Sequence, residues 1–438
     1  MILALVSTAA VLVALRLDRE PELPPGVPPQ PAAVAVDPRI DPVVATAPEP
    51  TPSGISRSIA PALRDPALGE LTGMISDSLT GQVLWTRDPG QPRIPASNDK
   101  VLSAAAFLEA MPHDQRLTTT VVAGDNGQVI LKGAGDPTLS AQPADADTFY
   151  TGPGRIADLA AQIERAGLPV TSVAVDLSAF SGPTMDTTWD RRDIQGGDIA
   201  PVESVMVDGA RLEPLDEYSP RSPTPGRMAG EALAAALGVE GPVTEVTAPA
   251  GDRVIAKVTS APLVTRVNDM LRYSDNVLAE TLAIELSVHR GGPPTHAGGV
   301  DAVEQVLSSM FPEQWAGTTL QDASGISYAN RTTPELLDAV MTAASGPSRP
   351  ALRPMLDGLP IAAGTGTLAD RFPATTPGAG WVRAKTGTLT GVSSLTGIVQ
   401  TVDGRVLSFA LMSGGTSPAD ARPALDAVVG QLRECGCR

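Results

Sequence analysis

Several residue types are scarce in this chain, and each scarcity excludes a class of architecture. Cysteine occurs twice in 438 residues and histidine three times. Cys435 and Cys437 lie one residue apart near the C-terminus, so they cannot cross-link distant parts of a fold. Together with three scattered histidines they supply too few ligands for a structural zinc site. The spacing leaves two interpretations open, a small terminal disulfide or a free tail.

Lysine is scarce as well. The chain holds four lysines and 28 arginines, so arginine is used wherever either cation would serve. The remaining lysines are therefore candidates for sites that need a compact, titratable ammonium group. Lys132 and Lys257 fall in strand-like runs, where a solvated side chain explains them. Lys100 and Lys385 instead fall in short polar motifs.

Positive charge is in short supply overall. A net charge of −17 leaves no basic stripe for a phosphate backbone, which argues against a nucleic-acid partner. What the chain does have is 42% hydrophobic residues, enough to bury a sizeable core. Composition and length together predict a globular protein of two or three domains.

The N-terminus combines an apolar segment with a proline-rich one. Residues 1–16 are apolar up to Leu15, a length that is short for a membrane span and suits an export signal. Because no cleavage site is convincing, we favour an uncleaved membrane anchor. Residues 17–56 form a predicted disordered linker, since eleven prolines between 21 and 52 favour extended polyproline II of up to ~100 Å. We therefore expect an extracytoplasmic protein of the cell envelope, exported or anchored by this segment.

Hydrophobic patterning predicts a sheet assembled from both ends of the chain. Five strands are expected at 71–78, 82–86, 381–388, 394–401 and 406–413. Asp403-Gly404 is a strong hairpin signal between the last two. Helices are expected at 97–111, at 262–286 with a break at 272–276, and at 300–310, 333–343 and 418–433, with a loop at 289–299. The pattern predicts an α+β catalytic domain, an antiparallel sheet covered by helices, formed by 57–115 and 259–438.

The segment 116–258 differs from its flanks in its expected pattern of secondary structure. Short strands alternate with turns and two helices: 118–123, 128–131, 173–176 and 254–258 for the strands, 155–166 and 228–237 for the helices, with a loop at 219–226. Strands of the first sheet lie on both sides of this segment in the sequence. We therefore predict one α+β domain inserted into the catalytic domain.

Three short motifs occur once each, in the order S-x-x-K, S-x-N and K-T-G. Ser97–Lys100 opens a predicted helix, Ser274–Asn276 lies at a helix break, and Lys385–Gly387 lies in a predicted strand. Residues three apart on a helix share a face, so Ser97 and Lys100 point the same way. An isolated S-x-x-K often matches by chance. Three ordered motifs holding two of the four lysines instead indicate a serine acyl-transfer site.

The residue types match the steps of acyl transfer, which needs a nucleophile, a base and a proton donor for the leaving group. Ser97 is the predicted nucleophile. Lys100 is the predicted base, because a buried amine loses its proton easily and the chain has no G-x-S-x-G motif. Ser274 is expected to pass a proton to the leaving nitrogen. Lys385 is expected to lower the pKa of Lys100 through its charge and to attract an anionic group.

Other residues of the motifs are predicted to bind substrate. The Asn276 amide is expected to hold the substrate backbone, and the Thr386 and Thr388 hydroxyls a carboxylate. Gly387 allows the substrate to approach its strand closely. The backbone N–H groups of Ser97 and Thr388 form the predicted oxyanion hole.

Three further segments indicate which protein family the chain resembles. Gly133–Leu139 is similar to a G-G-G-D-P-T-L segment, Asp322–Arg331 to D-x-S-G-L-S…N-R, and Leu359–Arg371 to L-P-x-x-G…G-T-L…R. With the three motifs, they make the chain from about residue 58 to its end resemble the penicillin-recognising serine D,D-peptidases. More specifically, it resembles the low-molecular-mass class C (type-4) D-alanyl-D-alanine carboxypeptidases. The resemblance implies a transpeptidase/β-lactamase-like fold with an insert between the first two motifs, here short enough for one added domain.

The resemblance also implies an activity. It predicts a serine D-Ala-D-Ala carboxypeptidase that hydrolyses peptidoglycan stem peptides through an acyl-enzyme on Ser97, with β-lactams as covalent inhibitors and no metal or cofactor. Three alternatives stay open: a D,D-endopeptidase of peptidoglycan crosslinks, a β-lactamase, and a non-catalytic wall-binding protein. A β-lactamase often needs an additional glutamate, and no convincing E-x-x-x-N segment is found. The complete set of motifs argues against a protein without catalysis.

Overall fold

The computed structural model describes residues 46–249 and 251–436. Residues 43–438 group into one compact unit. The predicted anchor at 1–16 and most of the predicted linker at 17–56 lie outside the described residues. Among the helices of the described part, none has both the length and the apolar character required to cross a membrane.

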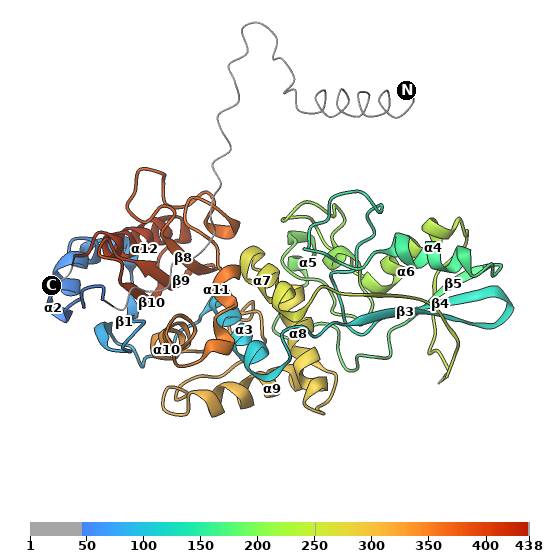
Figure 1. Ribbon diagram of the computed structural model, residues 1–438, viewed down its shortest axis with the longest axis horizontal. Coiled ribbons are helices and arrows are strands. Elements are labelled where there is room, and N and C mark those ends of the chain that lie inside the picture. The colour runs from blue at the N-terminus through green and yellow to red at the C-terminus, as the bar shows by residue number, and fades with distance from the viewer. Residues whose placement is uncertain (1–45, 250, 437–438) are drawn as a thin grey trace, which may run out of the picture. The chain divides into compact units, whose positions relative to one another are not determined.

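The first sheet joins strands from the two ends of the described chain, blue and red in Figure 1. Its strands are β1 Thr72–Asp77, β2 Val83–Arg87, β8 Val382–Leu389, β9 Val392–Gln400 and β10 Val406–Gly414. Their order is β2-β1-β10-β9-β8, and every neighbouring pair is antiparallel. At the turn between β9 and β10, Gly404 has a φ of 87°, which favours glycine. The predicted antiparallel sheet is confirmed.

Helices cover both faces of this sheet. Helix α10 Pro334–Ser345 packs on one face, and it shares a core with α3 Asp99–Ala110, α7 Leu263–Tyr273, α8 Asn276–His289 and α9 His296–Met310. Helices α2 Pro52–Ile59 and α12 Pro418–Arg433 cover the other face. Along β10, Ala410 and Met412 belong to the first core, whereas Phe409 and Leu411 belong to the second. Successive side chains of a strand point to opposite faces, so a strand covered on both sides is apolar throughout. The predicted α+β class is confirmed.

The folded part of the chain begins earlier than predicted. The linker is predicted to run to residue 56, but helix α2 already begins at Pro52. Thr51 caps this helix by accepting a hydrogen bond from the Gly54 backbone N–H, and a proline suits the first helical position. Ile55 and Ile59, four residues apart, are fully buried in the core shared with α12. The free energy gained by burying these two side chains outweighs the preference for an extended chain that the prolines give this segment.

A second sheet lies in the segment 116–258. Its strands are β3 Thr118–Ala123, β4 Gln128–Lys132, β5 Ser172–Asp176, β6 Thr244–Glu245 and β7 Val254–Thr259, in the order β6-β5-β4-β3-β7. The β4–β5 and β5–β6 pairs are parallel, and β3 pairs antiparallel with β4 and β7. Helices α4 Ile156–Arg165 and α6 Pro225–Leu237 share its core. The division into separate domains stays a prediction, because 43–438 form one compact unit.

Some element boundaries differ from the prediction. Helix α6 begins at Pro225, inside the predicted loop 219–226, because proline suits the first turn of a helix. Helix α9 begins at His296, inside the predicted loop 289–299, because Thr295 accepts a capping hydrogen bond from the Gly298 backbone. The remaining short helices are α5 Arg192–Gly196, α11 Met355–Gly358 and the 3₁₀-helices Ala62–Arg64, Pro66–Leu68, Ala96–Asn98, Asp125–Gly127, Asp208–Ala210, Pro350–Leu352 and Gly366–Leu368. They are too short for a periodic pattern to reveal.

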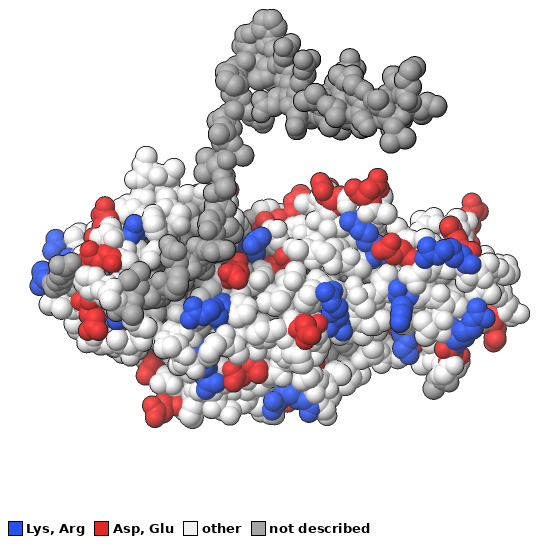
Figure 2. Space-filling model, viewed as in Figure 1, with Lys and Arg blue, Asp and Glu red and all other residues white. Residues whose placement is uncertain are grey.

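The C-terminal cysteines are described only in part. Cys435 is buried and is not a free thiol, which excludes the free-tail interpretation for this residue. Cys437 lies outside the described residues. On the face in Figure 2, acidic and basic side chains are interspersed. The negative net charge is therefore not gathered into one patch on that face.

Candidate active site

The three sequence motifs meet at one cleft of about 540 Å³. Its lining includes five of the predicted site residues: Ser97, Ser274, Asn276, Thr386 and Thr388. Lys100 and Lys385 are fully buried, and each donates a hydrogen bond to a serine that lines the cleft. The 3₁₀-helix Ala96–Asn98 with the start of α3, the junction of α7 and α8, and strand β8 therefore supply one motif each.

The turn that carries Ser97 is held between two glycines. Ala96 has a φ of 50°, an unusual conformation for a residue with a side chain. A Cβ on Gly325 would collide with the carbonyl oxygen of Ala96, and a Cβ on Gly387 would come 2.6 Å from that of Pro95. From its place in the K-T-G motif, Gly387 is predicted to allow close substrate approach. The structure adds that both glycines let the backbone of this turn pack tightly.

Lys100 has three polar partners within hydrogen-bond distance. Its Nζ donates to Asn276 Oδ1 at 2.5 Å and to the Ser324 carbonyl oxygen at 2.6 Å, and it lies 3.1 Å from Ser97 Oγ. The first two oxygens can only accept, so they take two N–H groups of the amine. When Lys100 is neutral, its lone pair then faces the Ser97 hydroxyl. This geometry suits removal of the Ser97 proton.

Burial makes the neutral form of Lys100 accessible. It lowers the pKa of Lys100 to about 8, against four carboxylates that raise it: Asp322, Glu280, Asp275 and Asp99. Burial and repulsion from Lys100 also lower the pKa of Lys385 well below its usual value. Repulsion between the two ammonium groups acts on both amines, so it disfavours the state in which both are protonated. The expected effect of Lys385 on the pKa of Lys100 stays a prediction. Burial is the main cause at both amines, because each is removed from water.

Ser274 and Lys385 form a second pair. Lys385 Nζ donates to Ser274 Oγ at 2.8 Å and to the Thr386 carbonyl oxygen at 2.7 Å. Ser274 ends helix α7 in the left-handed conformation, with a φ of 56°. That backbone geometry turns the chain between α7 and α8 and directs the hydroxyl to Lys385. Asn276, two residues on, is fixed at both ends of its amide, since its Nδ2 donates to the Asp198 carbonyl oxygen at 2.8 Å.

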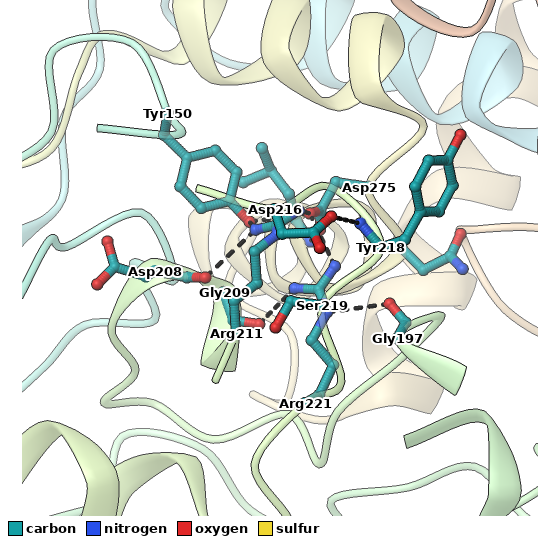
Figure 3. A network of polar contacts seen from close by, with 12 residues as sticks. Tyr150, Gly197, Asp208, Gly209, Arg211, Asp216, Tyr218, Ser219, Arg221 and Asp275 are labelled. Carbon is teal, nitrogen blue, oxygen red and sulfur yellow. Dashed lines mark hydrogen bonds and ion pairs between the residues drawn. The ribbon is translucent and has the colours of Figure 1, made fainter. Parts of the chain in front are cut away.

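Asp275, the central residue of S-x-N, is the hub of a buried network (Figure 3). Its Oδ2 accepts hydrogen bonds from Tyr150 Oη at 2.9 Å and from Arg211 at 2.7 Å, with Arg221 at 3.5 Å. Its Oδ1 accepts from the Leu278 backbone N–H and caps helix α8. Burial alone would raise the pKa of Asp275, but the two guanidinium groups outweigh it and hold that pKa well below the usual range. The segment 116–258 thus fixes the S-x-N motif.

The K-T-G strand presents hydroxyls to the cleft. Thr386 Oγ1 lies 2.8 Å from Thr367 Oγ1, and Thr388 Oγ1 accepts a hydrogen bond from Arg422 Nε at 3.2 Å. These hydroxyls and the guanidinium of Arg422 can serve as donors to a carboxylate. Arg422 belongs to α12 and had no signal in the sequence analysis.

A cluster of buried acids beside Lys100 was also missed. Asp99, Glu280 and Asp322 are each at most 1% exposed. Glu280 and Asp322 accept backbone hydrogen bonds from the turn that presents the Ser324 carbonyl oxygen to Lys100. Both carboxyl oxygens of Asp99 lack a hydrogen-bond partner within the described part of the chain, and burial raises its pKa well above the usual value. The D-A-S-G segment was the only sequence signal for this cluster.

The chain matches a known protein family over most of its length. The model of the D-Ala-D-Ala carboxypeptidase 3 (S13) family matches residues 55–217 and 217–435. The chain is 48% identical to carboxypeptidase DacB of Mycolicibacterium smegmatis over 444 residues, covering 100% of this chain and 96% of that one. It is also 48% identical to a carboxypeptidase of Mycobacterium tuberculosis over 420 residues, covering 94% and 90%.

A solved structure has a similar fold. Penicillin binding protein 4 from Haemophilus influenzae superimposes with a TM-score of 0.67 at 20% identity, covering 87% of this chain and 98% of that one. At that identity, the match supports the fold.

Proposed function

The chain belongs to the D-Ala-D-Ala carboxypeptidase 3 (S13) family, and from that membership we propose that it removes the terminal D-alanine of peptidoglycan stem peptides through an acyl-enzyme on Ser97. Two relatives named carboxypeptidases, each at 48% identity, support the activity. The covalent route rests on one observation: Lys100 Nζ lies 3.1 Å from Ser97 Oγ while two carbonyl oxygens hold its other hydrogens.

Acylation begins when neutral Lys100 accepts the proton of the Ser97 hydroxyl. The Ser97 oxygen then forms a bond to the carbonyl carbon between the two D-alanines. The backbone N–H groups of Ser97 and Thr388 stabilise the negative charge that develops on the carbonyl oxygen. Thr386 and Thr388 bind the terminal carboxylate, and Asn276 binds the peptide backbone.

The leaving nitrogen needs a proton before its bond to the carbonyl carbon breaks. Ser274 delivers its hydroxyl proton to that nitrogen and recovers one from Lys385, which donates to it at 2.8 Å. Lys100 has gained one proton and Lys385 has lost one, so the charge on the lysine pair is unchanged. Water then attacks the carbonyl carbon of the ester, and one of its protons goes to the neutral Lys385. Lys100 gives its extra proton to the Ser97 oxygen as the ester bond breaks, so both lysines return to their starting states.

β-Lactams act in this proposal as covalent inhibitors that acylate the same hydroxyl. The name of the Haemophilus influenzae relative, penicillin binding protein 4, supports this. Hydrolysis of peptidoglycan requires a location outside the cytoplasm, where residues 1–16 would export the protein or anchor it at the membrane.

A labelling experiment tests the acyl-enzyme. Purified protein is incubated with a fluorescent penicillin, and tryptic peptides are mapped by mass spectrometry. We expect one adduct, on Ser97, and release of D-alanine from a pentapeptide that ends in D-Ala-D-Ala.

Ser97→Ala should remove both signals, and Lys100→Ala should slow labelling by at least about 100-fold. Arg227→Met serves as a matched control, because Arg227 lies on the surface in an ion pair with Glu231. An adduct on another residue, or unchanged labelling of Lys100→Ala, would contradict the assigned roles.

A further inference from the structure

Two arginines stand at the K-T-G end of the cleft, and their surroundings differ. Arg371 and Arg422 both line the cleft. Arg371 is paired with Asp426 through two contacts, at 2.5 Å and 3.0 Å. Arg422, one turn before Asp426 on α12, has no carboxylate within 4.0 Å in the described part of the chain. Arg371 is therefore held in an ion pair, whereas Arg422 forms none within the described part of the chain.

The orientation of Arg422 is set by the K-T-G strand. Its Nε donates to Thr388 Oγ1 at 3.2 Å, and its backbone carbonyl oxygen accepts from Arg371. Its two Nη groups have no hydrogen-bond partner among the residues described. Partial burial and the charge of Arg371 lower the pKa of Arg422, so an anion bound here would relieve an unfavourable contact between cations. The guanidinium nevertheless stays protonated at any physiological pH.

The neighbouring hydroxyls define which anion fits. Thr386 and Thr388 are the residues proposed to hold the terminal carboxylate of the substrate. A carboxylate bound to Thr388 Oγ1 lies beside the guanidinium that already donates to the same oxygen. The planar fork of an arginine matches the two oxygens of a carboxylate, which makes this pairing stronger than one neutral hydrogen bond.

From these contacts we infer that Arg422 is a specificity residue that binds the free terminal carboxylate of the peptide substrate together with Thr388. The inference rests on the proposed function and adds a binding group to it. Arg422 contributes two N–H donors and a positive charge that forms no ion pair within the described residues. The cleft therefore selects peptides that end in a free carboxylate over those whose end is blocked.

Two substrates that differ only at this group test the inference. The first is a pentapeptide ending in D-Ala-D-Ala, and the second is the same peptide with a C-terminal carboxamide. The value of kcat/KM is measured for each by mass spectrometric detection of the shortened peptide. We expect Arg422→Leu to reduce kcat/KM for the free acid by about 10- to 100-fold, since a hydrogen bond to a charged group is lost. For the carboxamide the change should be less than about twofold.

Two variants serve as controls. Arg422→Lys keeps the charge without the fork, and it should recover part of the preference for the free acid. Arg433→Leu removes the same charge from the same helix, but Arg433 lies over the Trp381 ring at 3.8 Å, and it does not line the cleft. This variant should keep the wild-type preference between the two substrates.

The outcomes separate the two proposals. An Arg422→Leu enzyme that loses both activities equally, or neither, overturns the role of Arg422 while the wild-type activity stands. A wild-type enzyme that cleaves neither peptide overturns the proposed function itself, and the inference with it. Labelling of Ser97 by penicillin is measured in parallel, so that a misfolded variant is recognised.

Discussion

Replacing Arg211 with methionine removes the strongest partner of Asp275 and keeps an unbranched side chain without its charge. Asp275 Oδ2 then loses its 2.7 Å contact, and Tyr150 Oη loses the N–H that donates to it at 2.9 Å. Asp275 is fully buried, so its carboxylate cannot recover these hydrogen bonds from water. Removing one partner of a buried ion pair costs about 3–5 kcal/mol of unfolding free energy. We expect the lower end, about 3 kcal/mol, because Arg221 stays 3.5 Å away.

The same substitution should slow acylation. Ser274 and Asn276 flank Asp275, and helix α8 is capped by its carboxylate. A displacement of about 1 Å in a catalytic group can cost on the order of 100-fold in rate. We expect the rate of penicillin acylation to fall by about 10- to 100-fold in the protein that remains folded.

A double-mutant cycle separates this interaction from general disruption. The variants are Arg211→Met, Asp275→Asn and the double variant, compared by urea unfolding and by the rate of labelling with a fluorescent penicillin. Once Asp275 has become an uncharged asparagine, the loss of Arg211 should cost at least about 2 kcal/mol less than in the wild type. Arg227→Met, in an exposed ion pair with Glu231, is the matched control and should show no resolvable change. Costs that add to within about 0.5 kcal/mol would refute the interaction between Arg211 and Asp275 as the source of this stability.

Three further changes probe the residues around Ser97. The rate of acylation should rise about tenfold per pH unit and level off near pH 8, because burial lowers the pKa of Lys100 to about 8 and the neutral amine is the base; a profile that is flat from pH 6 to 9 would contradict this. Asp99→Asn should raise the unfolding free energy by at least about 1 kcal/mol at neutral pH. Burial raises the pKa of Asp99, so the wild-type protein loses unfolding free energy as pH increases above the pKa of Asp99 in the unfolded state. The stability advantage of Asp99→Asn should therefore disappear in acid. Urea unfolding at several pH values measures this difference. Gly325→Ala should abolish labelling, because a Cβ would collide with the Ala96 carbonyl oxygen and Gly325 has a φ of 83°; normal labelling would show that this turn is not fixed.

Much of the fold could be predicted because its signals are local. The strands β3 and β10 and the helix α12 were placed within one residue, since each has an alternating or amphipathic pattern and clear turn residues. The start of the fold was placed too late, because Pro52 belongs equally to a disordered linker and to a helix N-terminus. What distinguishes them is the burial of Ile55 and Ile59 against α12, which lies at the other end of the chain.

For the candidate site too, local signals could be predicted and long-range contacts could not. The sequence by itself predicted Ser97, Lys100, Ser274 and Lys385 as catalytic residues, because acyl transfer requires these residue types in short motifs of fixed spacing. The structure brings them together in two hydrogen-bonded pairs. Local spacing carries such information wherever the chemistry resides in one turn of helix or strand.

Tertiary structure alone decided which residues act on those motifs. Arg211 reaches Asp275 across 64 residues of sequence, and Arg422 reaches Thr388 across 34. It also decided the electrostatics, since burial by the fold is the main reason that the pKa of Lys100 falls to about 8. Burial and long-range contacts arise only when the chain packs, so no local pattern of residues can encode them.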